Sequence, residues 1–484
     1  MTVPLVLIHG YSDSAKGLQR WRDLLIAHRQ LDPARVHLIN YQTLTNEVTI
    51  RDIAEGLDRA LTQEAGIGEL EEFDAVVHST GMLVIRAWLT RYAPMSLRDL
   101  ERTRRLRHLV AIAPATNGSP VAHKGRSWLG ALFKGNKKDF LGPDFLESGH
   151  QILRALELGS PFTWDLGEKD MFGDGDNKRF ESGPLTPFVF TICGDPGLNL
   201  LSDLATKSLG VKTGGSDGVV RWAGAPLNSR RLIIDYTREV ISDGTDSISS
   251  RALIKVSSWS NQRNQLILWP GHDHGTILRP KDEDPLIELV ADAFNVSSDS
   301  QFEQWNARAS RLADAARVSH KKPEKWQQFI IRVLDERGDS VEDWTISLKK
   351  KLKGAKDGQY VDIDDLHPYE MNKSYRCLHI NLTESNLADS SDVAEIDSFV
   401  MELSMNADSQ YVLYSMGQSD HSSPSGDSMF GISEFKVELI DHLMPGAGSF
   451  NLLMAYSTTF IDFRVNRQLR LDQDGRAQLC HLQK

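Results

Sequence analysis

One stretch of the chain, residues 73–89, sets the strongest limit on what this sequence can fold into. It reads FDAVVHSTGMLVIRAWL: an apolar, β-branched run stops at His78-Ser79-Thr80-Gly81, and a helical pattern begins at once. A buried parallel strand followed directly by an amphipathic helix is the plainest interpretation. A serine on such a corner projects its hydroxyl outward, next to the unpaired N–H groups at the start of the helix. Ser79 is therefore a candidate nucleophile.

The residues around Ser79 depart from the common nucleophile elbow. That pattern is G-x-S-x-G, whereas this chain has V-H-S-T-G, with Val77 at the position of the first glycine. Short S-x-G matches also arise by chance, and a serine that only caps a helix is the alternative explanation. The remainder of the chain has to decide between the two.

Apolar runs on both sides of this corner alternate between strand and helix patterns. We expect helices at residues 18–28, 50–61 and 285–294, and strands at residues 3–8, 36–41, 73–77, 109–113, 188–193 and 265–269. This alternation predicts an α/β fold with a parallel sheet. Ligands bind beyond the carboxyl ends of the strands in such sheets. His9-Gly10, Ser79 and residues 271–274 all follow strand ends, so the sequence predicts a site at that edge.

A long insertion separates the fourth and fifth strands. Residues 117–187 contain many apolar side chains, which predict a cap over the active site or, alternatively, the core of a subdomain. Residues 231–236 and 253–256 are expected to add strands to the same domain before its last strand.

The pattern changes near residue 295. A polar connector and an Ala- and Arg-rich helix precede a series of alternating strands that starts at Trp326. Short strands at this spacing predict an antiparallel β-sandwich. We therefore expect an α/β catalytic domain at residues 1–296, a helical linker at 297–322 and a β-sandwich accessory domain at 323–484.

A nucleophilic serine needs a base and an acid that orients the base. In α/β enzymes of this kind the chain order is serine, then Asp or Glu, then His. Asp195 and Asp217 follow the fifth strand, and His272 and His274 follow the last strand. Residue order alone leaves both acids and both bases open.

Four segments resemble the α/β-hydrolase superfamily, in its serine lipase and esterase branch, and are similar to lecithin-cholesterol acyltransferase-like and inositol-deacylase-like enzymes. LVLIHGY (5–11) resembles the first strand and oxyanion turn, and VHSTG (77–81) resembles the elbow. IAPATNGSPVA (112–122) resembles the P-x-x-G-S/T-P-x-A segment at the start of the cap, and SDGVV (216–220) resembles the acid segment. The resemblance covers about 295 residues and implies an α/β-hydrolase fold with a cap insertion.

The resemblance also implies which residues act. The family's acid lies in a D-G-x-V segment, which favours Asp217, and its histidine precedes a small residue and an apolar helix start, which favours His274. The implied oxyanion donors are the backbone N–H groups of Tyr11 and Thr80.

The implied activity is that of a serine carboxylester hydrolase, a lipase or phospholipase, working through an acyl-enzyme without a cofactor. The alternatives are an esterase or thioesterase for small soluble esters, and a binding module that has the fold without the catalysis.

Composition excludes some functions and leaves others open. A net charge of -11 argues against a general nucleic-acid binder, and three scattered cysteines form neither a metal-binding spacing nor a disulfide framework. The start of the chain lacks the basic region of a signal peptide, which predicts a cytoplasmic protein, with export by a route without a cleaved signal as the alternative. Lysines at positions 349–351 and 353 predict either peripheral contact with anionic headgroups or a charged sandwich edge. The accessory domain could also bind a protein partner.

Overall fold

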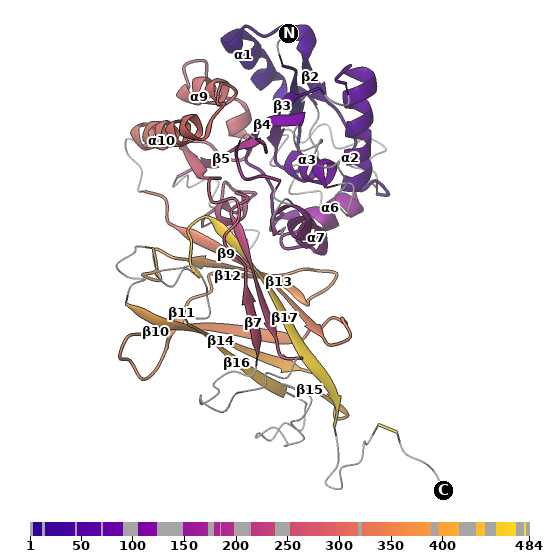
Figure 1. The fold of residues 1–484 in the computed structure, drawn as a ribbon, viewed down its shortest axis with the longest axis vertical. Helices are drawn as coiled ribbons and strands as arrows, with labels where there is room; N and C mark the ends of the chain where they lie inside the picture. The colour runs from indigo at the N-terminus through magenta and orange to yellow at the C-terminus, as the bar shows by residue number, and fades with distance from the viewer. Residues whose placement is uncertain are drawn as a thin grey trace, which may run out of the picture. The chain divides into compact units, whose positions relative to one another are not determined.

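The computed structural model divides the chain into two compact units (Figure 1). The first unit comprises residues 1–229 and 259–324, and the second comprises residues 230–258 and 325–484. The structure describes residues 3–11, 15–43, 46–68, 71–90, 105–122, 149–172, 179–183, 185–197, 214–237, 252–317, 322–388, 395–415, 432–440, 452–470 and 479–480.

A six-stranded parallel sheet forms the centre of the first unit, in the order β2-β1-β3-β4-β5-β8. Its strands are β1 (Leu5–Ile8), β2 (Val36–Ile39), β3 (Phe73–His78), β4 (Leu106–Ile112), β5 (Phe188–Asp195) and β8 (Leu266–Pro270). Every residue of β1, β3 and β5 is buried, as expected for parallel strands covered on both faces. The predicted α/β architecture is confirmed.

Helices cover both faces of this sheet (Figure 1). They are α1 (Gln19–Arg29), α2 (Ile50–Arg59), α3 (Gly81–Leu89), α6 (His150–Leu156), α7 (Pro161–Asp170), α9 (Pro285–Ala293) and α10 (Asp299–Ala316). Helices α1, α9 and α10 share one apolar core with the sheet, while α2, α3, α6 and α7 pack against one another. Shorter helical turns are η1 (Ala15–Leu18), η2 (Pro33–Arg35), η3 (Ala60–Glu64), η8 (Trp222–Gly224) and η9 (Thr276–Leu278).

The predicted helical linker at 297–322 is part of the first unit. Phe302, Trp305, Ala309 and Ala313 of α10 are buried in the core, and the Trp305 indole donates to the Leu289 carbonyl at 2.9 Å. These residues recur on one face of the helix, which is the pattern of a helix packed on a core. Two of these four residues are alanines, so the buried face carries little apolar bulk that would mark it in the sequence.

The predicted boundary of the catalytic domain also differs from the structure. Strands β6 (Ser229–Asp235) and β7 (Leu253–Val256) lie inside the expected range 1–296, yet they pair with each other and join a sheet of the second unit. A strand's own residues predict that it pairs, but its partner is set by long-range packing.

The second unit is a β-sandwich. A seven-stranded sheet runs β12-β13-β9-β17-β6-β7, with β15 paired to β17, and a four-stranded sheet runs β11-β10-β14-β16. The remaining bounds are β9 (Trp326–Asp335), β10 (Trp344–Leu352), β11 (Gln359–Val361), β12 (Asp365–Pro368), β13 (Tyr375–Asn381), β14 (Ile396–Asn406), β15 (Val412–Ser415), β16 (Ile432–Ile440) and β17 (Ser457–Leu469). The pairing is mainly antiparallel as expected, but β9 and β17 run parallel.

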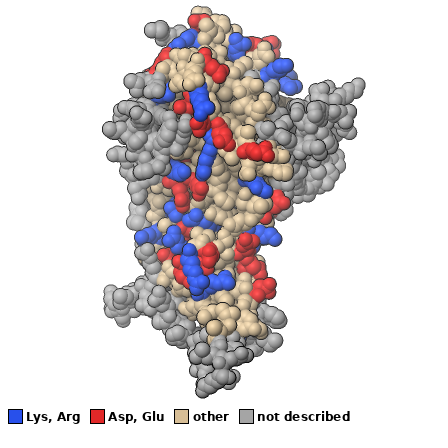
Figure 2. Space-filling view, turned by 90° about the vertical axis from the view of Figure 1, so that its right-hand side faces the viewer, with Lys and Arg blue, Asp and Glu red and all other residues tan. Residues whose placement is uncertain are grey.

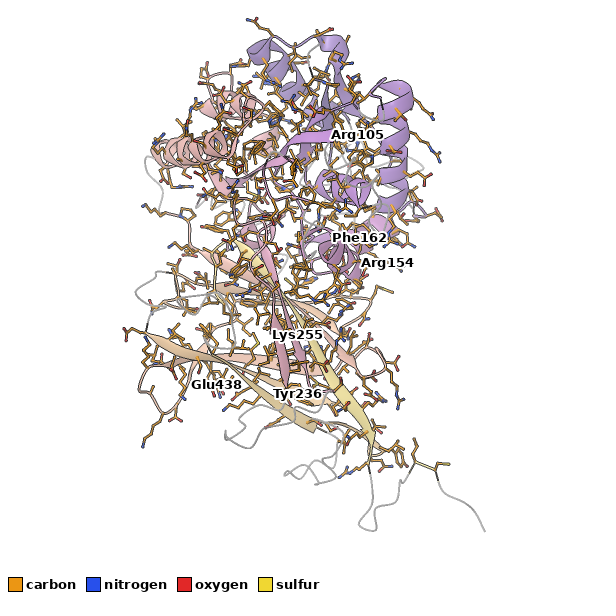
Figure 3. The ribbon with its side chains drawn as sticks, in the orientation of Figure 1. Arg105, Arg154, Phe162, Tyr236, Lys255 and Glu438 are labelled. Atoms are coloured by element: carbon orange, nitrogen blue, oxygen red, sulfur yellow. The ribbon has the colours of Figure 1, made fainter. Side chains whose placement is uncertain are left out.

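Side chains from both sheets form one apolar core. Phe329 and Phe463 of the first sheet and Phe399 and Val437 of the second belong to it. Tyr236, labelled in Figure 3, follows β6 and donates its hydroxyl to the Lys436 carbonyl of β16, which links the two sheets.

Lys349, Lys350 and Lys351 lie on β10, which pairs with β11 and β14 and is not the edge strand of its sheet, and Lys353 follows the strand. Lys349 pairs with Glu402 at 2.8 Å, and Lys351 lies 3.8 Å from Glu438. Figure 2 shows positive and negative side chains interspersed on the face in view. Pairing with glutamates reduces the positive charge that these lysines present to a headgroup.

Candidate active site

Ser79 occupies a strained corner between β3 and α3. Its φ of 53° lies in the left-handed region, which side chains other than glycine adopt at a cost. Three backbone hydrogen bonds hold the corner: the Ser79 N–H donates to Ile112 at 3.2 Å, and the Ser79 carbonyl accepts from Met82 and Ala115, each at 3.1 Å. A strained serine between strand and helix is the geometry of a nucleophile elbow.

Two glycines allow the chain to approach this corner closely. A Cβ on Gly81 would lie 2.6 Å from the Ile8 carbonyl oxygen, and a Cβ on Gly10 would lie 2.9 Å from Ser79 Cβ. Val77 needs no such freedom, because it is a buried residue of β3 in register with Ile8 and Ala111. Val77 is thus an ordinary strand residue, and the left-handed conformation of the corner falls on Ser79.

Asp217 and His274 form a buried pair. His274 Nδ1 lies 2.8 Å from Asp217 Oδ2, and the His274 backbone N–H donates to the Asp217 carbonyl at 3.0 Å. The N–H groups of Val219 and Val220 donate to Asp217 Oδ1 at 3.0 and 2.8 Å. These bonds stabilise the ionised carboxylate, which can then only accept from Nδ1. Because the proton sits on Nδ1, Nε2 is the basic nitrogen of His274.

The alternative acid and base have other partners. Asp195 pairs with Arg317 at 3.1 Å, and His272 Nε2 lies 3.0 Å from Asp284 Oδ2. Asp284 in turn caps the N-terminus of α9. Of the four candidates, the structure brings Asp217 and His274 together.

His78 connects the serine corner to the base. Its ring centroid lies 4.8 Å from that of His274, and its Nε2 lies 3.1 Å from the His274 carbonyl oxygen. Burial, and then the neighbouring His274, lower the pKa of His78 well below 6.5, so the ring is neutral. A neutral His78 that donates from Nε2 to the His274 carbonyl ties the base to the residue next to Ser79.

Sequence reasoning missed the residue that supports the β1 turn, Tyr41. Its ring stacks on His9 at 4.1 Å, its hydroxyl donates to the His9 carbonyl, and its N–H donates to His9 Nε2 at 3.3 Å. His9 therefore carries its proton on Nδ1, which donates to the Gly10 carbonyl at 2.7 Å. The only sequence signal for Tyr41 is its place at the end of the expected second strand.

The two expected oxyanion donors lie at this edge of the sheet. Tyr11 follows Gly10 in the turn beside Ser79, and Thr80 is the N-cap residue of α3. Their role as donors stays a prediction.

The described part of the expected cap packs on α3. Arg86, fully buried, donates to both oxygens of Asp170 in α7 at 2.8 Å. The apolar residues on which the cap prediction rests, from Trp128 to Leu146, lie outside the described residues.

Within the described ranges, no cluster of three His, Cys, Asp or Glu side chains could hold a metal ion. No helix built from those ranges combines the length and apolarity needed to span a membrane.

Neither a protein-family model nor a curated protein matches this sequence. Two solved structures of the phospholipase PlaB from Legionella pneumophila are similar over the whole chain. One is 18% identical with a TM-score of 0.72 and covers 100% of this chain and 97% of that protein. The other, a complex with thio-NAD, is 17% identical with a TM-score of 0.71 and covers 100% and 98%. The likeness shows that the fold of both units is shared with that protein.

Proposed function

We propose that this chain is a serine carboxylester hydrolase that acts on lipid acyl esters as a lipase or phospholipase. The observation that carries the proposal is the buried Asp217–His274 pair, which the His78 ring joins to the left-handed corner at Ser79. The fold shared with a phospholipase supports the same reaction class.

In the proposed reaction, His274 Nε2 takes the proton of the Ser79 hydroxyl as its oxygen attacks the ester carbonyl. Asp217 stabilises the resulting imidazolium, which then protonates the departing alcohol. Water, activated by the same histidine, releases the carboxylic acid from the acyl-enzyme. The N–H groups of Tyr11 and Thr80 would bind the oxyanion, each contributing about 3 kcal/mol.

The test of the nucleophile is Ser79→Ala. We expect hydrolysis of p-nitrophenyl esters to fall by about 10⁴-fold or more, with the circular dichroism spectrum unchanged. Ser182→Ala is the matched control, because Ser182 is also buried and also has a φ of 53°. A fluorophosphonate probe should label the wild type and the control but not Ser79→Ala. Undiminished turnover by Ser79→Ala would contradict the proposal.

The substrate class is tested separately from the nucleophile. We expect turnover to rise with acyl chain length and phospholipid vesicles to be hydrolysed. Activity confined to short soluble esters would instead indicate the esterase or thioesterase alternative. Folded protein that neither turns over esters nor reacts with the probe would indicate the binding module.

The proposed reaction needs no cofactor, so turnover should be equal with and without thio-NAD, the compound found with PlaB. An absolute requirement for thio-NAD would contradict a hydrolysis carried out by the chain's own residues.

A further inference from the structure

Ser119 lies in the segment that follows β4, and its side chain contacts the loop of Asp217. The residue is fully buried, and its Oγ donates to the Val219 carbonyl at 2.6 Å. A carbonyl oxygen cannot donate, so the hydroxyl proton must point to Val219. The direction of this hydrogen bond is therefore fixed.

The carbonyl of Val219 and the N–H of Val220 belong to one peptide group. That group is planar and trans, so its N–H points away from its carbonyl oxygen. The oxygen end accepts from Ser119, and the N–H end donates to Asp217 Oδ1 at 2.8 Å. A bond at one end orients and polarises the group for the bond at the other end. Ser119 and Asp217 thus hold opposite ends of the same peptide plane.

The backbone of Ser119 is tied to the described part of the expected cap. Its N–H donates to the Leu156 carbonyl at 2.7 Å, and its own carbonyl accepts from Leu158 at 3.2 Å. Gly118 has a φ of +91°, and a Cβ there would lie 2.6 Å from the Glu157 carbonyl oxygen. The backbone of Ser119 is therefore held at the end of α6 by hydrogen bonds that do not involve the acid loop.

Neighbouring side chains brace the same loop further along. Thr116 donates to the Ala225 carbonyl, and Asn117 donates to the Gly224 carbonyl at 3.2 Å. Of the three contacts, the one from Ser119 reaches the peptide group that binds Asp217.

We propose that Ser119 is a positioning residue for hydrolysis, orienting the Val219–Val220 peptide that holds Asp217 and, through Asp217, His274. This inference rests on the proposed function and assigns Ser119 no contact with the substrate.

The first test compares Ser119→Ala, Ser119→Thr and Ser160→Ala. Ser160 is a matched control because it is also fully buried and donates to a backbone carbonyl, that of Ala155 in α6, away from the acid loop. We expect Ser119→Ala to lower kcat about 10-fold with KM changed less than about 2-fold, which is the effect of losing one hydrogen bond that acts on a charged group. Ser119→Thr keeps the hydroxyl and should restore kcat to within about 3-fold of the wild type. Equal kcat values for Ser119→Ala and Ser160→Ala would overturn the inference.

The second test places Ser119→Ala in an Asp217→Asn background. A residue that acts through Asp217 has nothing left to position there, so the double variant should be no more than about 2-fold slower than Asp217→Asn alone. A further loss of about 10-fold in that background would overturn the inference. Failure of the proposed function is distinguishable, because it would appear as a Ser79→Ala variant that keeps its activity.

Discussion

Two buried Asp–His pairs lie at opposite ends of the strands of the parallel sheet. Asp217 and His274 meet at 2.8 Å beyond the carboxyl ends of the strands, and Asp74 and His108 meet at 2.7 Å near the amino ends of β3 and β4. All four side chains are at most 2% exposed. Distance and burial do not separate the two pairs.

The two pairs differ in what each histidine contacts besides its aspartate. His108 Nε2 lies 2.6 Å from the Val296 carbonyl oxygen, so both ring nitrogens are committed and the ring ties the sheet to the α9–α10 junction. His274 instead lies against His78, the residue before Ser79. The carbonyl beside His108 offers no proton to abstract, whereas in the proposed function His274 would take the proton of the Ser79 hydroxyl. An Asp–His pair alone therefore does not identify a catalytic site.

The sharpest test of this comparison changes the two acids in the same way. Asp217→Asn should reduce kcat by about 10⁴-fold, because the amide favours the wrong histidine tautomer, while the protein stays folded. Asp74→Asn should leave kcat within about 3-fold of the wild type and lower the melting temperature. Ester turnover and thermal unfolding of both variants check this. Similar losses of kcat in the two variants would mean that the edges do not differ in function.

Removing the other member of the amino-edge pair should mainly affect stability. His108→Ala leaves the Asp74 carboxylate buried without its ring partner, which we expect to lower the free energy of unfolding by about 3 kcal/mol. Urea denaturation measures this loss. His272→Ala, which breaks a more exposed Asp–His contact, is the control and should cost less. An equal or larger loss in the control would contradict the structural role of His108.

The neutral His78 predicts a pH dependence of stability. Its pKa is lowered well below 6.5 in the folded chain, so below pH 6.5 the unfolded chain binds a proton that the folded chain excludes. The free energy of unfolding should therefore fall as the pH falls, by about 1 kcal/mol between pH 6.5 and 5.5 from this residue. Denaturation of wild type and His78→Asn over this range should show a shallower slope in the variant. Parallel slopes would mean that His78 is charged in the folded state.

The smallest effect concerns the support of the β1 turn. Tyr41→Phe removes the hydroxyl that donates to His9, and we expect kcat to fall about 5-fold, equivalent to about 1 kcal/mol. Tyr360→Phe, at a residue 66% exposed in the second unit, should match the wild type. If Tyr41→Phe also matches the wild type, the hydroxyl does not contribute to the turn's role in catalysis.

The sequence predicted the strands of the first unit, because parallel strands leave continuous apolar runs. Position after a strand end left two acids and two bases open, and the family resemblance favoured Asp217 and His274, the pair that the structure brings together. It did not predict Tyr41 or Ser119, whose roles depend on hydrogen bonds to backbone groups distant in sequence. The prediction that β6 and β7 belong to the first domain was wrong for a related reason, because the strand with which a segment pairs depends on residues distant in sequence. The buried face of α10 consists of residues 302, 305, 309 and 313, two of which are alanines. The sequence therefore marked this face only weakly, and the helix was expected to be a linker.

Strands β6 and β7 belong to the second unit but are synthesised long before the rest of it, so they have to wait for their partner strand. These strands are made before residue 260, whereas β17, which lies beside β6 in the sheet, ends at Leu469. The first unit likewise needs β8 and α10, which follow the excursion. A nascent chain must therefore carry an unmatched hairpin edge for about 200 residues, and at roughly 5–20 residues per second this lasts on the order of 10–40 s. Until β17 is made, the edge of β6 has no partner strand, and an unpaired strand edge is a site where aggregation can begin or a chaperone can bind.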